Sequence, residues 1–318
     1  MNAGVRLGAF AAGLVVAFAA AYTTAAAVSS PDRAATAQRG HGGPASDAPT
    51  AAEQSGTMSP VDPAGLSLAE NGYVLGSVRA PGVSGLRGAL SFTVLDPAGR
   101  PLTDYATVHD KQLHLIVVRS DGTHFAHVHP TLDKDIGAWS TPWTWNAAGT
   151  YRVFADFQPS AAGSARLTLT RTVEVAGEVI PAPPVTTRTV DEVAGYTVRL
   201  DGTLTANRSE SLTATITRDG RPVTTLQPYL GAFGHLVALR EGDLAYLHVH
   251  PEGAAPAPGR TGGPAVSFAA TAPSAGRYLL YLDFQVDDTE HTASFVVDAA
   301  RGDDTDPPPR QTPPHGGH

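Results

Sequence analysis

Short runs of alternating apolar and polar residues, separated by glycine or proline, fill the chain from about residue 70 to residue 300. A period of two places alternate side chains on one face of a β-strand. In the first half of this region, strands are expected at 73–78, 89–95, 112–119, 123–129, 139–145, 151–157 and 165–175. Seven short strands with turn signals between them predict an all-β, immunoglobulin-like β-sandwich, with another small all-β barrel as the alternative.

The second half of the region repeats the first. The matching stretches are Gly72-Tyr73 with Gly195-Tyr196, His127-Val128-His129-Pro130 with His248-Val249-His250-Pro251, and Asp156-Phe157-Gln158 with Asp283-Phe284-Gln285. Similar stretches at a nearly constant offset indicate a duplicated unit. We therefore expect one sandwich at 68–178 and a second at 187–300, joined by a Pro-rich linker at 179–186.

The two ends of the chain lie outside this repeat. An uncharged apolar run follows Arg6, so that residues 1–28 are typical of an export signal or of an N-terminal membrane-anchor helix. Segments 29–67, rich in Ala, Gly, Pro and Ser, and 301–318, a Pro- and His-containing tail, have no apolar pattern and are expected to be disordered. We expect both sandwiches outside the cytoplasm, either secreted or anchored to the cell membrane by the N-terminal segment.

Composition narrows the chemistry that the protein can carry out. The net charge of −8 argues against nucleic acid as the main partner. The absence of Cys excludes disulfides, Cys-type zinc sites, iron–sulfur clusters and thiol nucleophiles. With two Met in the chain, a Met-rich thioether site is excluded as well. Histidines, carboxylates and hydroxyls are left.

The strongest chemical signal is a set of three histidines in the third and fourth expected strands. Asp121-Gly122 is a preferred dipeptide of the two-residue type I′ hairpin, which pairs residues whose numbers sum to 243. His114 then faces His129, and Ile116 faces His127. Because opposed residues and residues two apart share a face, the three histidines converge on one patch.

The second copy predicts the same cluster. Gly242-Asp243 is compatible with a type II′ turn, which pairs residues whose numbers sum to 485. His235 then faces His250, and Val237 faces His248. Imidazoles placed in this way bridge to a common ion at about 2.0 to 2.1 Å. The same reasoning gives structural or surface roles to three other histidines, His109, His124 and His291.

Asp156 and Asp283 occupy equivalent places in a later strand of each copy. Each is a candidate fourth metal ligand or a candidate outer partner that orients a ligand histidine. Bonding to the backbone at a strand end is the ordinary alternative. Imidazole suits Cu(II) and Zn(II), and neither Cys nor a Met cluster is present to hold Cu(I). Two separate sites and one ion shared across the domain interface both stay open.

The stretches 114–118 with 127–130, and 229–239 with 248–251, resemble exported actinobacterial proteins with tandem YtkA-like and CopC-like immunoglobulin-type domains. The resemblance covers about 72–300. It implies handling of copper or another heavy metal in the periplasm or at the cell surface, together with an envelope metal-transport partner. The chain departs from CopC-type proteins in having no Met-rich loop.

Three classes of function fit these patterns. The first is an exported protein that binds and handles a metal ion, with one His-rich site in each sandwich. The second is a structural or adhesive tandem β-sandwich of the cell surface whose histidines are incidental. The third is a metalloenzyme with a three-histidine centre and an open ligand position. The sequence contains no Gly-x-Ser-x-Gly elbow and no phosphate-binding Gly loop, so we expect a binding protein and not an enzyme.

Overall fold

The computed structural model describes residues 64–183, 186–257 and 259–302 of the chain, except for the side chain of His248. The expected signal or anchor segment lies outside these residues, as do most of the expected spacer and most of the expected tail. The described residues form β-strands and no helix, in agreement with the predicted all-β class. Within the described ranges, therefore, no helix is long and apolar enough to cross a membrane.

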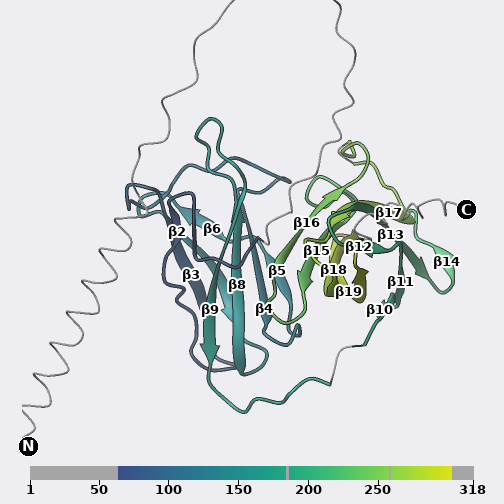
Figure 1. Ribbon diagram of the computed structural model, residues 1–318, viewed down its shortest axis with the longest axis horizontal. Coiled ribbons are helices and arrows are strands. Elements are labelled where there is room, and N and C mark those ends of the chain that lie inside the picture. The colour runs from purple at the N-terminus through teal and green to yellow at the C-terminus, as the bar shows by residue number, and fades with distance from the viewer. Residues whose placement is uncertain (1–63, 184–185, 258, 303–318) are drawn as a thin grey trace, which may run out of the picture. The chain divides into compact units, whose positions relative to one another are not determined.

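The first sandwich consists of two antiparallel sheets (Figure 1). One has the strand order β1 (Ala69–Glu70), β2 (Tyr73–Leu75), β3 (Arg87–Leu95), β7 (Ala138–Thr144) and β6 (Thr131–Asp133). The other has the order β5 (Ala126–Val128), β4 (Leu113–Arg119), β8 (Gly149–Phe157) and β9 (Leu167–Val175). Each of the seven expected strands is present to within three residues at either end, and the short strands β1 and β6 are additional.

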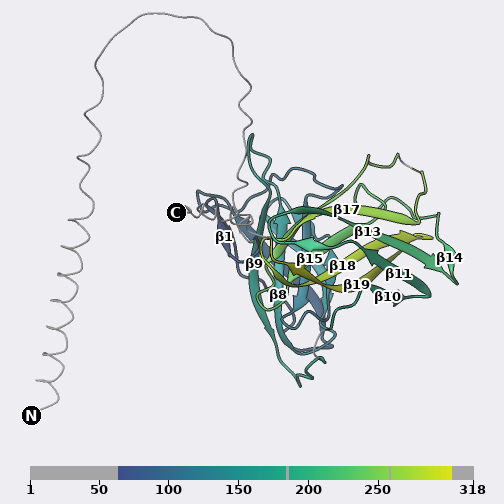
Figure 2. The same ribbon diagram turned by 45° about the vertical axis from the view of Figure 1, so that its right-hand side comes forward.

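The second sandwich repeats this arrangement with one difference. One layer contains β10 (Val190–Val193), β11 (Tyr196–Asp201), β13 (Ser209–Arg218), β14 (Arg221–Pro222) and β17 (Ala265–Thr271). The other contains β15 (His235–Arg240), β18 (Gly276–Val286), β19 (Thr289–Ala300) and β12 (Leu204–Thr205). β16 (Tyr246–Pro251) pairs first with β15 and then with β17, so it links the two layers. Figure 2 shows β13 and β17 side by side in the layer that also contains β10 and β11.

Each sandwich has its own apolar core, and the alternation of the strands fills it. Leu113, Leu115 and Val117 are buried in the first core, with Val128 packed against it, whereas Ala126 is half-buried outside it. In the second core, Leu236, Ala238 and Leu247 are buried, and Val249 packs against them.

A third apolar cluster joins the two sandwiches. Its buried residues come from β4 and β8 of the first sandwich and mainly from β15, β16, β18 and β19 of the second: Ile116, Val118, Phe154, Val237, Leu239, Leu244, Tyr246, Leu279, Tyr281 and Val296. The rings of Phe125 and Tyr281 stack with their centroids 3.9 Å apart, and the Tyr281 hydroxyl donates to the Gly122 carbonyl at 2.5 Å. Every residue of β4 is buried for this reason. In a lone sandwich, alternate residues of an antiparallel strand face water.

Replacing Ile116 with alanine tests this interface. The Ile116 side chain is fully buried on the face of β4 that points to the second sandwich. We expect Ile116→Ala to lower the free energy of unfolding by about 2 to 5 kcal/mol, through lost burial and the cavity left behind. Urea unfolding measures this change. Ile136→Ala is the matched control, because Ile136 is 62% exposed, and it should change stability by less than about 0.5 kcal/mol. Equal effects of the two substitutions would contradict the interface.

Candidate metal centre

The His-x-His-Pro stretch lies where the chain crosses from one sheet of its sandwich to the other. In the first sandwich, β5 pairs with β4 and β6 pairs with β7, and His129 and Pro130 lie between β5 and β6. In the second sandwich, the single strand β16 makes the same crossing. Proline lacks a backbone N–H, so Pro130 suits the point where the chain leaves β5 for β6, whereas Pro251 is the last residue of β16 and pairs with Phe268.

The predicted register of the first hairpin is confirmed, but the turn that sets it differs from the prediction. Ile116 pairs with His127, as the sum of 243 requires. The turn is not type I′, because Gly122 has a positive φ of 78° while Asp121 has none. Instead, residues 120–122 form a three-residue turn, in which the Gly122 N–H donates to the Arg119 carbonyl at 2.8 Å. One extra residue, His124 with a φ of 53°, then restores the register.

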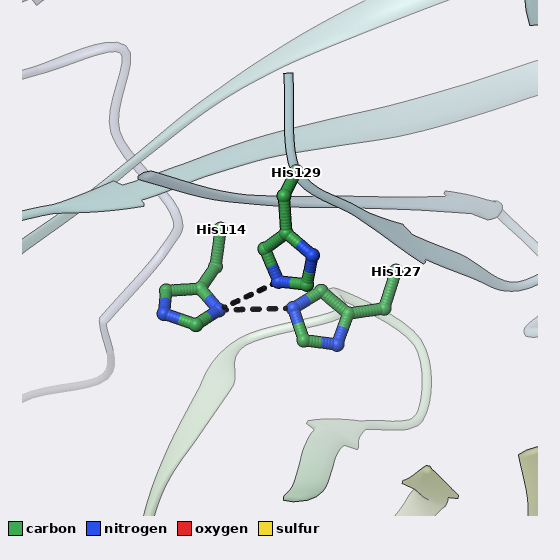
Figure 3. Close-up of side chains that lie close together, drawn as sticks. All are labelled: His114, His127 and His129. Atoms are coloured by element: carbon green, nitrogen blue, oxygen red, sulfur yellow. Dashed lines mark hydrogen bonds between the residues drawn. The ribbon is translucent and has the colours of Figure 1, made fainter. Parts of the chain in front are cut away.

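His114, His127 and His129 come together as the register predicts (Figure 3). His114 lies on β4, His127 on β5, and His129 directly after β5. The His114 Nδ1 atom lies 3.1 Å from His127 Nε2 and 3.3 Å from His129 Nε2. The three ligand atoms lie within 4.8 Å of one another. His114 and His127 are buried, and His129 is half-buried.

The hydrogen bonds on the far side of two rings determine which nitrogens face the centre as acceptors. His114 Nε2 lies 3.0 Å from the Val108 carbonyl oxygen, which only accepts, so this nitrogen carries the proton and donates. His127 Nδ1 donates to the Asp283 carboxylate at 2.8 Å. In the neutral rings, His114 Nδ1 and His127 Nε2 thus present lone pairs to each other. Only a proton or a metal ion between them makes this contact favourable.

The second sandwich supplies the carboxylate. Asp283 and His127 side chains are both fully buried, and the Thr292 hydroxyl donates to the second oxygen of Asp283 at 2.6 Å. A carboxylate that accepts from the outer N–H of a histidine fixes its tautomer and orients its ring. Asp156, the equivalent residue of the first sandwich, instead accepts from Arg166 and Thr168. Asp156 belongs to neither group of closely placed ligand atoms.

His235 joins the first sandwich's histidines and not His250. Its ring centroid lies 4.7 Å from that of His127 and 5.4 Å from that of His114. Together, His127, His235 and Asp283 form a second group with ligand atoms within 4.8 Å of one another. The predicted register is confirmed where the ladder forms, since Ala238 pairs with Leu247. The expected pairing of His235 with His250 does not form, because the β15–β16 ladder ends at Leu247 and β16 then pairs with β17.

Among the other predicted ligands, His250 is exposed, and its backbone pairs with Ala269. The backbone of His248 pairs with Thr271 on the same strand β17. Among the described side chains, His235 is grouped with His127 and Asp283 and not with His250.

His109 is a neighbour of the centre that the sequence pattern missed. It lies before β4, in a two-residue turn in which His109 and Asp110 both have positive φ. This turn brings the His109 ring to 6.2 Å from His114 and 6.0 Å from His235. His and Asp tolerate a left-handed backbone better than most residues, so the dipeptide was an available turn signal.

A cavity of about 20 Å³, lined among others by His109, Asp156, Arg166 and His235, borders this region. Such a volume holds about one water molecule. The two remaining histidines lie elsewhere, in agreement with the prediction. His124 is exposed, and His291 packs beside the rings of Tyr196 and Phe284.

Burial, followed by repulsion from neighbouring histidines, lowers the pKa of three histidines of the centre, His114, His129 and His235. Desolvation, followed by the neighbouring His127, lowers the pKa of His114 to about 4. The same two causes lower the pKa of His129 and that of His235 well below the ordinary value. Neutral imidazole is the form that binds metal ions. These three rings are therefore in the ligand form at neutral pH without the help of a metal ion.

Fold and site together define a tandem β-sandwich protein with a cluster of histidines between its two sandwiches. The chain belongs to the family described as "Domain of unknown function (DUF8832)", which matches residues 71–177 and again residues 189–301. The two matches confirm the internal repeat. The resemblance to YtkA-like and CopC-like proteins is not confirmed by them. No curated protein matches the chain.

Solved structures that resemble the chain include a marsupial T cell receptor, at 10% identity and a TM-score of 0.24, with 71% of this chain and 62% of that chain covered. The D00-D0 domain of Intimin is 11% identical with a TM-score of 0.20, over 71% and 98% of the two chains. The ectodomain of mouse nectin-like molecule 4 is 14% identical with a TM-score of 0.19, over 72% and 64%. Similarity at this level carries no argument about function.

The lowered pKa values predict how the stability of the metal-free protein depends on pH. The unfolded chain binds a proton at His114 near pH 6.5, whereas the folded chain does so only near pH 4. The unfolded state therefore binds more protons in this window, and the free energy of unfolding should be highest above pH 6.5 and fall as the pH drops towards 4. Urea unfolding in EDTA at several pH values measures this.

His114→Gln should flatten the profile, and His124→Gln, at an exposed position outside the cluster, should leave it steep. Identical profiles for the two variants would contradict the assignment of the acid sensitivity to the buried cluster.

Proposed function

We propose that the protein binds a Cu(II) or Zn(II) ion through His114, His127 and His129, as an exported protein that buffers or delivers the metal. The observation that carries this proposal is the convergence of three ring nitrogens, with His114 Nδ1 at 3.1 and 3.3 Å from the other two. Tetrahedral coordination at about 2.0 to 2.1 Å separates ligand nitrogens by about 3.3 Å. The observed spacings fit this value before any rearrangement.

The chemistry of the donor set supports the choice of metal. All three ligand atoms are imidazole nitrogens, and imidazole suits Cu(II) and Zn(II), whereas soft Cu(I) prefers thiolates and thioethers. The outer nitrogens of two of these rings are held by the Val108 carbonyl and the Asp283 carboxylate. Such outer partners are the usual support of a metal-binding histidine. Three protein ligands leave a fourth position for water or for a ligand that takes up the ion.

Handling of the metal outside the cytoplasm completes the proposal. Its support is the uncharged apolar run after Arg6, which suits a signal peptide or a membrane anchor, and the absence of cysteine. An exported metal-binding protein needs a second envelope protein to receive or supply the ion. We place that exchange beside His129, because it is the half-buried member of the three ligands.

A structural or adhesive role at the cell surface is the second candidate function. The apolar cluster between the sandwiches favours it, because this cluster fixes two domains into one unit as a rigid spacer requires. In that case the histidines bind no metal ion with useful affinity, and the two functions are separated by metal titration of the full-length protein.

The test is competitive titration of the full-length chain with Cu(II) and Zn(II) against a chelator of known affinity. Replacing His127 and His129 together with alanine removes two of three ligands and should weaken binding by more than about 100-fold. His124→Ala should leave the affinity unchanged, because His124 lies outside the cluster. Both variants keep the histidines of the tail, so adventitious binding there is the same. Equal affinity in the two variants would refute the proposal.

A further inference from the structure

One ring nitrogen of His235 is buried and has no hydrogen-bond partner among the described residues. The residue is 9% exposed, and its Nδ1 atom is buried without a hydrogen-bond partner among the described residues. Buried polar atoms of this kind are rare, and each requires an explanation such as a bound ion. His235 lies opposite Asp283 in the β15–β18 ladder, so the two side chains share one face of the sheet.

The surroundings of this nitrogen resemble the first group of ligands. His235, Asp283 and His127 each offer one ligand atom, and these atoms lie within 4.8 Å of one another. One oxygen of Asp283 is taken by the Thr292 hydroxyl at 2.6 Å. The other oxygen faces His127 Nδ1 at 2.8 Å. The Asp283 carboxylate therefore lies at the Nδ1 edge of His127, on the side away from His114, and an imidazole nitrogen of His235 lies within 4.8 Å of a carboxylate oxygen.

We infer that the protein has a second metal subsite, formed by His235, Asp283 and the Nδ1 atom of His127, so that the His127 ring bridges two ions. This inference rests on the proposed function, because the first ion occupies the Nε2 side of the same ring. The two ions lie about 6 Å apart, the span of one imidazole with a metal–nitrogen bond at each end. The second ion is of the same class as the first, Cu(II) or Zn(II).

The charges at this subsite suit a divalent cation. Binding of the second ion breaks the His127 Nδ1–H bond, and the proton leaves to solvent. The ring becomes an imidazolate with one negative charge, and the Asp283 carboxylate contributes another. These two negative charges offset half of the four positive charges of the two ions, in a buried place where an unpaired charge is costly. The sandwich interface closes around ligands from both halves of the chain.

The simpler account is that Asp283 only orients His127 and that the centre holds one ion. The two accounts differ in stoichiometry and in magnetism. Two Cu(II) ions bridged by one imidazolate couple their electron spins, so the bridged pair loses most of its ordinary Cu(II) resonance at low temperature. An isolated Cu(II) ion keeps its full signal.

The experiment loads the full-length chain with Cu(II), removes weakly bound metal on a chelating resin, and measures copper per chain together with the electron paramagnetic resonance signal. For the native sequence we expect a coupled pair and a low signal per copper. Asp283→Asn keeps the shape of the side chain and an acceptor for His127, and it should lose one copper per chain while the remaining copper shows its full signal. His235→Gln should behave in the same way.

His250→Gln is the matched control in the second sandwich, because His250 is exposed and belongs to neither group. It should keep both ions and the coupling. Thermal unfolding of all variants in EDTA identifies any variant that fails to fold. If either Asp283→Asn or His235→Gln fails to fold, the copper content and resonance signal of the other variant test the second subsite. A native protein that binds one copper, or two copper ions with full uncoupled signals, would overturn the second subsite. The proposed function fails separately, if the native protein retains neither copper nor, after the same loading with Zn(II), zinc.

Discussion

One hydrogen bond couples the two sandwiches to the chemistry of the histidines. His127 Nδ1 of the first sandwich donates to the Asp283 carboxylate of the second at 2.8 Å, and both side chains are fully buried. Removing either partner leaves a buried polar group unsatisfied, which costs about 1 to 3 kcal/mol and more when the group is charged. The same bond fixes the ring so that Nε2 points to His114 and His129. The orientation of the metal ligands therefore depends on the docking of the second sandwich.

The apolar interface and the centre support each other. Ile116, Val118 and Phe154 pack against residues of the second sandwich on the same sheet face that carries His114. This packing excludes water, and desolvation is the main reason for the lowered pKa values of His114 and His129. A metal ion that binds only when the two sandwiches are docked stabilises the docked state, and docking in turn keeps the imidazole ligands neutral. Metal affinity and domain docking are thus linked equilibria.

Much of the fold was predictable because a period of two, interrupted by glycine and proline, is a strong strand signal. The His127 register was predicted from a turn that does not form, since the bulge at His124 gives the same sum as a two-residue turn. The apolar contact between the sandwiches was not predicted, because the repeat defines two similar units and does not show which of their faces meet. The apolar run at residues 115–118 of β4 did indicate such a contact, because apolar residues at both odd and even positions are typical of a strand covered on both faces. The crossing of β16 between sheets depends on tertiary pairing, which a local pattern does not contain.

The most direct test of the account is an anomalous difference map, at the zinc absorption edge, from crystals of the full-length protein grown with Zn(II). The account predicts a peak at about 2.0 to 2.1 Å from His114 Nδ1, His127 Nε2 and His129 Nε2, with Asp283 still on the far side of the His127 ring. A map without a peak between these three nitrogens, or with its peak at His250 on the exposed end of β16, would contradict it.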